Sequence, residues 1–175
     1  MVRSDARENR ARILDAARAA FEENGQISMN QIAQLSGVGA GTLYRNFPTR
    51  EALVLEIYGQ ETQRIVDSAP GLLESMPPTQ ALRAWTLDLV DAMRKKHGLG
   101  DAISAGSIQA MNEQNYGPVM SAITTLLDAG KAAGTVRADA DPGDFLQLTA
   151  ALWRADSDDR TARMLDLILD GLAAH

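Results

Sequence analysis

Apolar residues along this chain recur at spacings of three and four, and no run alternates apolar and polar positions between turn residues. Spacings of three and four are typical of amphipathic helices, whereas alternation is typical of strands, so the sequence predicts an all-α protein. The first predicted helix opens with a capping box at Asp5 and Glu8 and is closed by a left-handed cap at Gly25. Its apolar face contains Ile13, Leu14, Ala17, Ala20 and Phe21.

Two short helices and then a longer one are predicted next. Ser28 and Gln31 form a second capping box, and a serine-glycine pair ends that helix after about two turns. A third helix is expected over residues 39–46 and ends before Phe47-Pro48, since the residue before a proline disfavours helical dihedral angles. Thr49 is then positioned to cap a fourth, longer helix.

The rest of the chain is also helical in pattern, with prolines and glycines as interruptions. Prolines and glycines between residues 68 and 79 predict a break after the fourth helix. The elements expected beyond the break are helices over 79–97, 101–111 and 119–134, one that starts at Asp141-Pro142 and carries Trp153, and one from about Asp159. About nine helices are therefore expected in all.

The segment over residues 28–51 places two short helices on either side of a tight turn at Gly37. This is the geometry of a helix-turn-helix, whose second helix enters the major groove of DNA. Val38 and Leu43 would then pack inward. The residues left exposed on the second helix are Gly39, Ala40, Thr42, Arg45 and Asn46. On pattern alone, an unrelated pair of packing helices is the alternative.

Charge is distributed unevenly along the chain. The net charge is −6, but residues 1–50 hold seven arginines against five acidic residues, while residues 51–175 hold ten basic and eighteen acidic residues. Phosphate contacts come from clustered Lys and Arg, so a mildly basic first part on an acidic second part permits DNA binding by the first. We place the domain boundary near residue 50, with a DNA-binding domain over 1–50 and a second helical domain over 51–175.

The run GVGAGTLYRNFPTREAL resembles the recognition-helix signature of the TetR family of bacterial transcription regulators. Residues 7–66 match that family's DNA-binding domain end to end, including the linking helix from residue 50, and GTVRADADPGDFLQLTAALW resembles its penultimate-helix region less sharply. The resemblance implies a homodimer of all-helical subunits. It also implies a three-helix domain that reads operator DNA, and a C-terminal domain that binds a small-molecule effector and dimerises through its last two helices. Repression is the family expectation.

Carried over by position, the resemblance implies three kinds of DNA contact. The phosphate contacts would come from Thr42, Tyr44, Asn46 and Arg50. The residues near base edges would be Ala40, Gly41 and Arg45. From the preceding helix, Asn30 would approach the duplex. The Gly39-Ala40-Gly41 run departs from the family because it offers no long side chain, which shifts direct base readout toward Arg45. Asn46 also departs, since it replaces a frequent histidine.

An effector pocket and a subunit interface are expected in residues 51–175. The candidate pocket residues are Trp85, Thr86, Met93, Met111, Tyr116, Met120 and Thr124, and the ligand would be small and largely apolar. Each of these residues is also compatible with plain core packing. The last two helices are apolar on more than one side, which favours a dimer interface over a deep core position. Its candidate residues are Phe145, Leu148, Leu152, Met164, Ile168 and Leu172.

Other classes of chemistry lack their residues in this sequence. There is no cysteine, the two histidines are far apart, and the aspartates lie where helices begin rather than at calcium-loop spacing. Nucleophile and phosphate-loop motifs are missing, so we expect no enzyme, metal or cofactor. No run approaches the roughly 20 apolar residues that span a bilayer, and we expect a cytoplasmic protein without a membrane partner. A helical small-molecule sensor or interaction module that has lost DNA binding is the alternative function.

Overall fold

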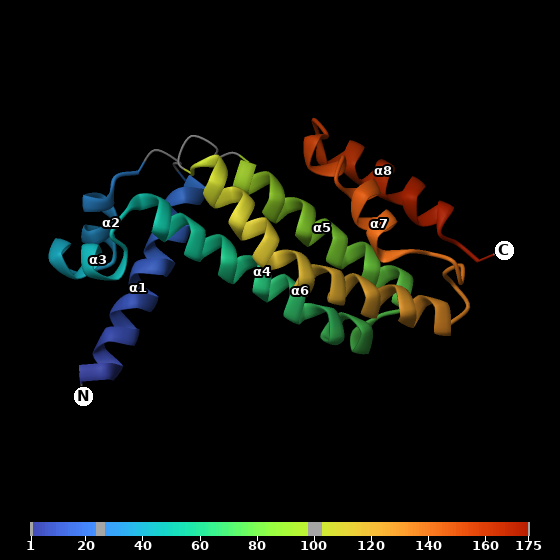
Figure 1. Ribbon diagram of the computed structural model, residues 1–175, viewed down its shortest axis with the longest axis horizontal. Coiled ribbons are helices and arrows are strands. Elements are labelled where there is room, and N and C mark those ends of the chain that lie inside the picture. Colours follow the sequence, from blue (N-terminus) through green and yellow to red (C-terminus); the bar gives the residue numbers. More distant parts are fainter. Residues whose placement is uncertain (1, 24–26, 98–102, 175) are drawn as a thin grey trace. The chain divides into compact units, whose positions relative to one another are not determined.

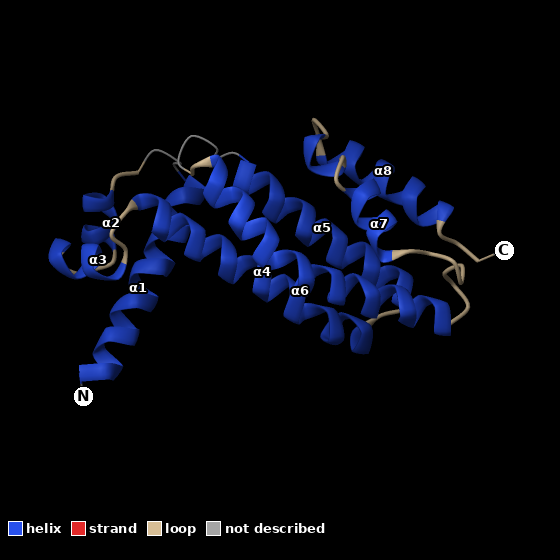
Figure 2. Cartoon of the chain, in the orientation of Figure 1, coloured by secondary structure: helices blue, strands red, loops and turns tan. Residues whose placement is uncertain are grey.

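The computed structural model describes residues 2–23, 27–97 and 103–174 (Figure 1). The elements in chain order are α1 (Val2–Glu23), α2 (Met29–Leu35), α3 (Ala40–Asn46), α4 (Arg50–Ser75), α5 (Pro78–His97), α6 (Ala105–Ala132), α7 (Pro142–Thr149), the short 3-10 helix η2 (Leu152–Arg154) and α8 (Asp158–Gly171). Figure 2 shows helices and loops throughout the described residues and no strand, so the predicted all-α class is confirmed.

The chain forms two compact units. Unit 1 comprises Met1–Tyr58 and Gly98–Ile108, and unit 2 comprises Gly59–His97 and Gln109–His175. The helices α4 and α6 therefore each contribute residues to both units. The domain boundary near residue 50 stays a prediction, and unit 1 extends into α4 as far as Tyr58.

Unit 1 has its own hydrophobic core, to which α1, α2 and α3 contribute with the first turns of α4. The three helices α1, α2 and α3 pack on one another pairwise. The core residues are Ile13, Leu14, Ala17, Met29, Ile32, Ala33, Leu43, Phe47, Leu53 and Ile57. Because this apolar surface is buried within the unit, the position of α3 is set by packing on α1 and α2.

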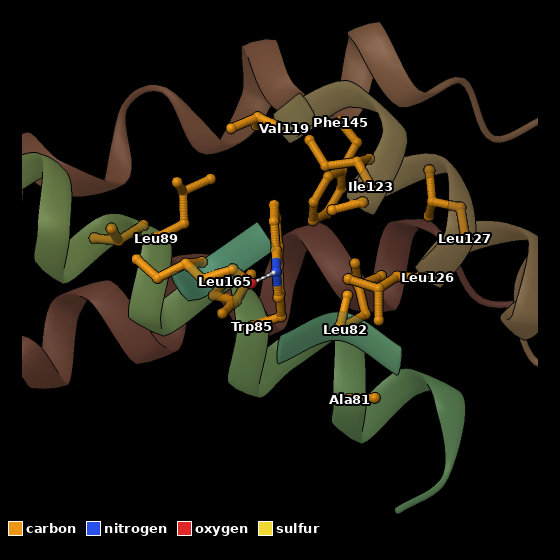
Figure 3. Packing of buried hydrophobic residues seen from close by; sticks show 14 of the residues in the cluster. Ala81, Leu82, Trp85, Leu89, Val119, Ile123, Leu126, Leu127, Phe145 and Leu165 are labelled. Carbon is orange, nitrogen blue, oxygen red and sulfur yellow. Dashed lines mark hydrogen bonds between the residues drawn. The ribbon is translucent and has the colours of Figure 1, made fainter. Parts of the chain in front are cut away.

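Unit 2 packs around the side chain of Trp85 on α5, which is fully buried. Its indole Nε1 donates a hydrogen bond of 2.7 Å to the carbonyl oxygen of Ile65 on α4, drawn as a dashed line in Figure 3. Leu82, Ile123 and Phe145, from three different helices, surround the ring. Because the indole N–H is hydrogen-bonded, burial of the ring leaves no donor unsatisfied. Trp85 therefore holds α5 against α4 as part of the core.

Three predicted helix starts are confirmed by hydrogen bonds. The Ser28 hydroxyl oxygen accepts from the backbone N–H of Gln31 at 3.3 Å, and the Gln31 side chain accepts from the backbone N–H of Ser28 at 3.0 Å. Thr49 accepts from the N–H of Ala52 at 3.0 Å. Asp141 accepts from the two N–H groups that follow Pro142, at 2.7 and 3.0 Å. These caps satisfy N–H groups that a helix start leaves without an intrahelical partner.

The break predicted between residues 68 and 79 is confirmed at residues 76–77 but does not lie at Pro70, and the break predicted between 111 and 119 is wrong, because two helices continue through a proline. The helix α4 runs past Pro70 to Ser75, and α6 is one helix over the region where 101–111 and 119–134 were expected separately. Pro70 and Pro118 are exposed, whereas the adjacent Ala69 and Val119 are buried in the core of unit 2. A proline removes one backbone hydrogen bond, and burial of the opposite helix face outweighs that loss.

Three predicted helix boundaries also need correction. The first helix begins at Val2, so Asp5 lies inside it rather than at its cap, and α5 begins at Pro78 rather than at a Thr79 cap. Pro78 at a first helical position needs no N–H partner. The helix from Pro142 ends at Thr149, and Trp153 lies in η2. The predicted cap at Gly25 falls outside the described residues.

None of the helices in the described part of the chain is both long and apolar enough to cross a membrane.

Candidate nucleic-acid interface and ligand cavity

The turn between α2 and α3 depends on one glycine. Gly37 has a φ of 65°, in the left-handed region that side-chain-bearing residues rarely adopt. Its N–H donates to the carbonyl of Gln34 at 3.1 Å, and the next N–H, of Val38, donates to the carbonyl of Ala33 at 3.1 Å. These bonds end α2 and start the chain toward α3 within a few residues, as a helix-turn-helix requires.

One side of α3 is buried and the other is exposed. Leu43 is fully buried in the core of unit 1, and Phe47 just beyond the helix is buried with it. At 100° per residue, Gly41 and Arg45 lie on the side of the helix opposite Leu43, and both are exposed. The outward face of α3 therefore consists of one glycine, one arginine and their flanking residues.

The polar side chains of α3 are held along the helix itself. Arg45 donates from Nε to the carbonyl of Gly41 at 3.1 Å and from a terminal nitrogen to the Thr42 hydroxyl oxygen at 3.2 Å. Asn46 donates from Nδ2 to the carbonyl of Thr42 at 2.9 Å. Exposed hydrogen bonds of this kind are weak, so Arg45 can exchange them for an acceptor outside the chain.

Neither Gly39 nor Gly41 is required by the fold of the chain itself. Neither has a positive φ, and a Cβ built on either residue meets no atom within 4 Å. Gly39 is the N-cap of α3 and supplies no capping side chain, although Ser, Thr, Asp and Asn are the preferred residues there. The two glycines leave the backbone at the start of α3 uncovered by side chains.

Arg10 on α1 fixes the end of α3 and was not singled out from the sequence. Its guanidinium donates to the carbonyl of Asn46 at 3.3 Å, forms an ion pair with Glu56 at 3.2 Å, and lies 4.4 Å from the ring centre of Phe47. A cation at a helix C-terminus interacts favourably with the last carbonyls. No local sequence pattern pairs a residue on the first helix with the end of the third.

The start of α4 lies next to the start of α6 within unit 1. Arg50 is half-buried, with its guanidinium carbon 5.1 Å from the ring centre of Phe21. The neighbouring Glu51 carboxylate accepts a hydrogen bond of 2.8 Å from the backbone N–H of Ser104. This bond, with those of the Ser104 and Ser107 side chains, holds the pKa of the Glu51 carboxyl below its ordinary value.

The predicted DNA-contacting residues lie on or next to three successive elements, α2, α3 and α4. Gly39, Ala40, Gly41, Tyr44 and Arg45 are exposed on or before α3, and Thr42 and Asn46 on the same helix are half-buried. Asn30 is exposed in the first turn of α2, and Arg50 begins α4. Their contacts with DNA stay predictions.

A cavity of about 240 Å³ lies within unit 2. It is lined by residues of α4, α5, α6, α7 and η2. Of the predicted pocket residues, Met93 and Tyr116 line it. Trp85, Thr86 and Met111 do not, because they are buried in packed core, and Met120 and Thr124 do not line it either. The lining residues that the sequence did not single out include Thr62, Asn112, Asn115, Thr149 and Trp153.

The predicted interface residues divide into two groups. Phe145 and Leu152 are buried in the core of unit 2, at 1% and 0% exposure. They therefore stabilise the single chain and are not accessible for contact with a second subunit. Leu148 is 55% exposed, and Met164, Ile168 and Leu172 are partly buried against the core. Leu167 on α8, which was not among the predicted interface residues, is 72% exposed.

The part of the chain that the structure describes contains no cluster of three or more His, Cys, Asp or Glu residues able to hold a metal ion.

Comparison with solved structures identifies close relatives over nearly the whole chain. The TetR transcriptional regulator SCO0520 of Streptomyces coelicolor is 41% identical, with a TM-score of 0.78 over 94% of this chain and 98% of that one. A TetR transcription regulatory protein of Mycobacterium vanbaalenii is 34% identical, with a TM-score of 0.75 over 99% and 100% of the two chains.

Sequence comparisons agree with the structural ones. An HTH-type transcriptional regulator of Staphylococcus aureus is 50% identical over 54 residues, which are 30% of this chain and 29% of that protein, so less than a third of that curated relative is matched. The family model for bacterial regulatory proteins of the tetR family matches residues 13–57. The model for the C-terminal domain of SbtR-like transcriptional regulators matches residues 77–174. The chain belongs to the TetR family of bacterial transcriptional regulators.

Proposed function

We propose that this protein is a sequence-specific DNA-binding regulator of transcription, and that α3 is the helix that enters the major groove. The observation that carries the proposal is the two-sided character of α3. Leu43 anchors one side in the core of unit 1, while Gly41, Tyr44 and Arg45 are exposed on the rest of the helix. A helix held rigidly by its inner face and polar on its outer face is what groove binding requires.

The residues of α3 and its neighbours divide into two roles. Thr42, Tyr44, Asn46 and Arg50 contact phosphates, from hydroxyls, an amide and a guanidinium, and set the register of the protein on the duplex. Arg45 reads a base edge, for which a guanine with its two acceptors is the preferred partner of a guanidinium. The uncovered backbone at Gly39 and Gly41 lets α3 approach the groove closely.

Regulation by a small molecule is the second part of the proposal. The FadR protein of Thermus thermophilus, a TetR family repressor that shares the fold at 21% identity and a TM-score of 0.60, was solved in complex with lauroyl-CoA. In this chain, the cavity of unit 2 receives the effector. Effector binding changes the position of the reading helices through α4, which runs from Arg50 into the cavity wall at Thr62, and so releases a repressor from its operator.

A homodimer completes the proposal. Two copies of α3 read two half-sites of an operator of approximate two-fold symmetry, so the chain needs a partner surface. The exposed Leu148 on α7 and Leu167 on α8 provide apolar area on the last helices of the chain. Large exposed apolar side chains lose contact with water when subunits associate, which favours association.

Substitution of Tyr44 tests the assignment of α3. Tyr44 is 44% exposed, so Tyr44→Ala leaves the core of unit 1 intact. Loss of a phosphate contact in each subunit weakens operator binding at least about tenfold, measured by fluorescence anisotropy with labelled DNA. The control is Gln80→Ala, which truncates an exposed side chain of α5 in unit 2 that does not line the cavity and leaves operator affinity within twofold. Operator binding unchanged by Tyr44→Ala would show that α3 is not the reading helix.

The alternative function is a helical sensor that does not bind DNA. The lack of long side chains over Gly39-Ala40-Gly41 is the feature that favours it. A DNA binder weakens steeply with added salt because bound counterions are released from the duplex, whereas an uncharged ligand site does not respond to salt in this way. The same anisotropy titration repeated at higher salt therefore distinguishes the two functions.

A further inference from the structure

The cavity of unit 2 has no charged residue among the residues that line it. Its apolar wall comes mainly from Leu89, Val90, Met93, Val119, Leu146 and Trp153. The polar lining consists of neutral side chains only, namely Thr62, Asn112, Asn115, Tyr116 and Thr149. A charged ligand moved from water into such a site would lose its hydration without gaining an opposite charge, which strongly opposes binding.

Three of the charged residues next to the lining positions bond to other residues of the chain. Arg94, beside Met93, forms an ion pair with Asp158 at 2.7 Å and donates to the carbonyl of Leu152 at 3.3 Å. Asp91, beside Val90, pairs with Lys95 at 2.8 Å. Glu113, which separates two lining residues of α6, accepts from Gln109 at 3.0 Å. The neutral character of the cavity is therefore a property of the packed helices around it.

One hydroxyl that meets the cavity makes no hydrogen bond to the described residues. Thr62 on α4 is 5% exposed and lines the cavity. The other buried hydroxyl residues all donate to the carbonyl four residues earlier in the chain. These residues are Ser36, Thr86, Thr149 and Thr161, with donor-acceptor distances of 2.7, 2.7, 3.0 and 3.0 Å. Thr62 differs from them in facing a space where a ligand can bind.

A hydroxyl that meets the cavity and has no partner in the chain can donate a hydrogen bond to an acceptor on a ligand. The half-buried carboxamide of Asn115 on α6 also lines the cavity and has no partner in the described part of the chain. The two groups lie on different helices, so one ligand that bonds both would connect α4 with α6. This arrangement favours a ligand with polar atoms at its edge and an apolar body against the leucine, valine and methionine wall.

The volume of the cavity limits the size of the ligand. About 240 Å³ is below the roughly 300–1,000 Å³ of sites that take drug-sized molecules. A singly substituted aromatic ring is a ligand of suitable size for such a cavity.

We propose that the effector of this protein is a small, uncharged, largely apolar molecule that presents an oxygen acceptor to the hydroxyl of Thr62. The lining offers no opposite charge to a carboxylate, phosphate or ammonium group that enters the cavity, so such groups are disfavoured there. The inference rests on the proposed function, in which this cavity receives the effector. It adds the chemical class of the ligand and names the residue that selects for it.

Three compounds of matched shape test the ligand class on the full chain. Acetophenone has a neutral carbonyl, benzoate replaces it with a carboxylate, and isopropylbenzene replaces it with an apolar group. Each is titrated by calorimetry below its solubility limit. We expect acetophenone to bind about five- to tenfold more tightly than isopropylbenzene, and benzoate to bind more weakly than both. Benzoate binding as tightly as acetophenone, or no binding by any of the three, would overturn the proposal.

Two threonine variants test the role of the hydroxyl. Thr62→Val keeps the shape of the side chain and removes the hydrogen-bond donor. The variant should therefore bind acetophenone and isopropylbenzene with about equal affinity. Thr86→Val is the matched control, because Thr86 is equally buried but bonds to Leu82 and does not line the cavity, and the preference stays as in the unaltered protein. A preference that survives Thr62→Val unchanged would overturn the assignment. If Thr62→Val fails to fold, Thr62→Ser is measured in its place. It keeps a hydroxyl, so the protein should still prefer acetophenone.

DNA binding is measured separately on the same samples. Selective operator binding together with equal binding of the three compounds would leave the proposed function standing and reject the inferred ligand class. Selective binding of acetophenone without any DNA binding would reject the proposed DNA-binding function and keep the ligand class. The two failures are therefore distinguishable.

Discussion

The outward side of α3 has an unusual composition at the scale of single residues. In the proposed complex, Gly41 lies where a side chain would face the duplex, and nothing within the chain requires glycine there. Glycine in a helix interior destabilises it by up to about 1 kcal/mol relative to alanine. A residue that weakens its own helix without a packing reason points to a constraint from outside the chain, and close approach to a phosphate backbone is such a constraint.

Substitution of Gly41 separates stability from DNA binding. In Gly41→Ala, the new methyl group meets open space and the helix propensity of α3 improves, so the free energy of unfolding rises by up to about 1 kcal/mol. Operator affinity falls, because the methyl group lies between α3 and the duplex. Urea denaturation and anisotropy measure the two effects.

Gly71→Ala is the matched control for this substitution. It also adds a methyl group in open space inside a helix, but on α4 in unit 2, where it stabilises the protein without lowering operator affinity. Equal operator affinity of the Gly41→Ala variant and the unaltered protein would contradict the close approach of α3 to DNA.

At the scale of the elements, local and long-range features differ in how well the sequence predicts them. The starts of α2, α4 and α7 were predicted correctly, because each depends on a side chain that bonds an N–H only two or three residues away. The break after the fourth helix falls at residues 76–77 rather than at Pro70, and none occurs near Pro118, because burial of the adjacent residues against other helices is a long-range effect. Local pattern therefore predicted these three starts, but it misplaced the starts of α1 and α5.

The start of α6 is held by Glu51, whose pKa is lowered by the hydrogen bonds from Ser104 and Ser107. Because the folded-state pKa lies below the ordinary value of 4.5, the contribution of this contact is fully present above pH 4.5 and is lost as the pH falls through the lowered pKa. Glu51→Gln should therefore lower the melting temperature at pH 7.

The pH dependence of this effect is the sharper part of the prediction. Well below pH 4.5, both proteins carry a neutral side chain at residue 51, so their melting temperatures should converge. Thermal denaturation followed by circular dichroism at the two pH values measures the difference. A difference of the same size at both would show that the charge of Glu51 does not stabilise the start of α6.

At the scale of the whole molecule, the sequence predicted the helix-turn-helix more completely than the ligand cavity. The residues of α3 are consecutive, so a motif identifies them together. The residues around the cavity come from five elements, and only Met93 and Tyr116 were anticipated. Thr62 could not be found from the sequence, because its missing hydrogen bond is visible only once α4 is packed.

The proposed dimer makes a prediction at this scale. Leu167 is 72% exposed on α8, so Leu167→Glu changes the free energy of unfolding of one chain by less than about 0.5 kcal/mol. In the dimer, the carboxylate is buried against apolar surface, and the variant should sediment as a monomer with unchanged helix content.

The control for this substitution is Leu35→Glu, which places the same charge at a 63% exposed leucine on α2 and should leave the sedimentation coefficient as it was. Sedimentation velocity at equal concentrations compares the three proteins. A dimer that persists in Leu167→Glu would place the subunit interface elsewhere.

The most direct test of the central claim, that unit 1 binds operator DNA through α3, is fluorescence anisotropy with labelled DNA from immediately upstream of the protein's own gene. A scrambled duplex of the same length and composition is measured beside it, at two salt concentrations. We predict saturable binding that favours the native duplex and weakens steeply at the higher salt concentration. Equal binding of the native and scrambled duplexes at both salt concentrations would contradict sequence-specific recognition of that site.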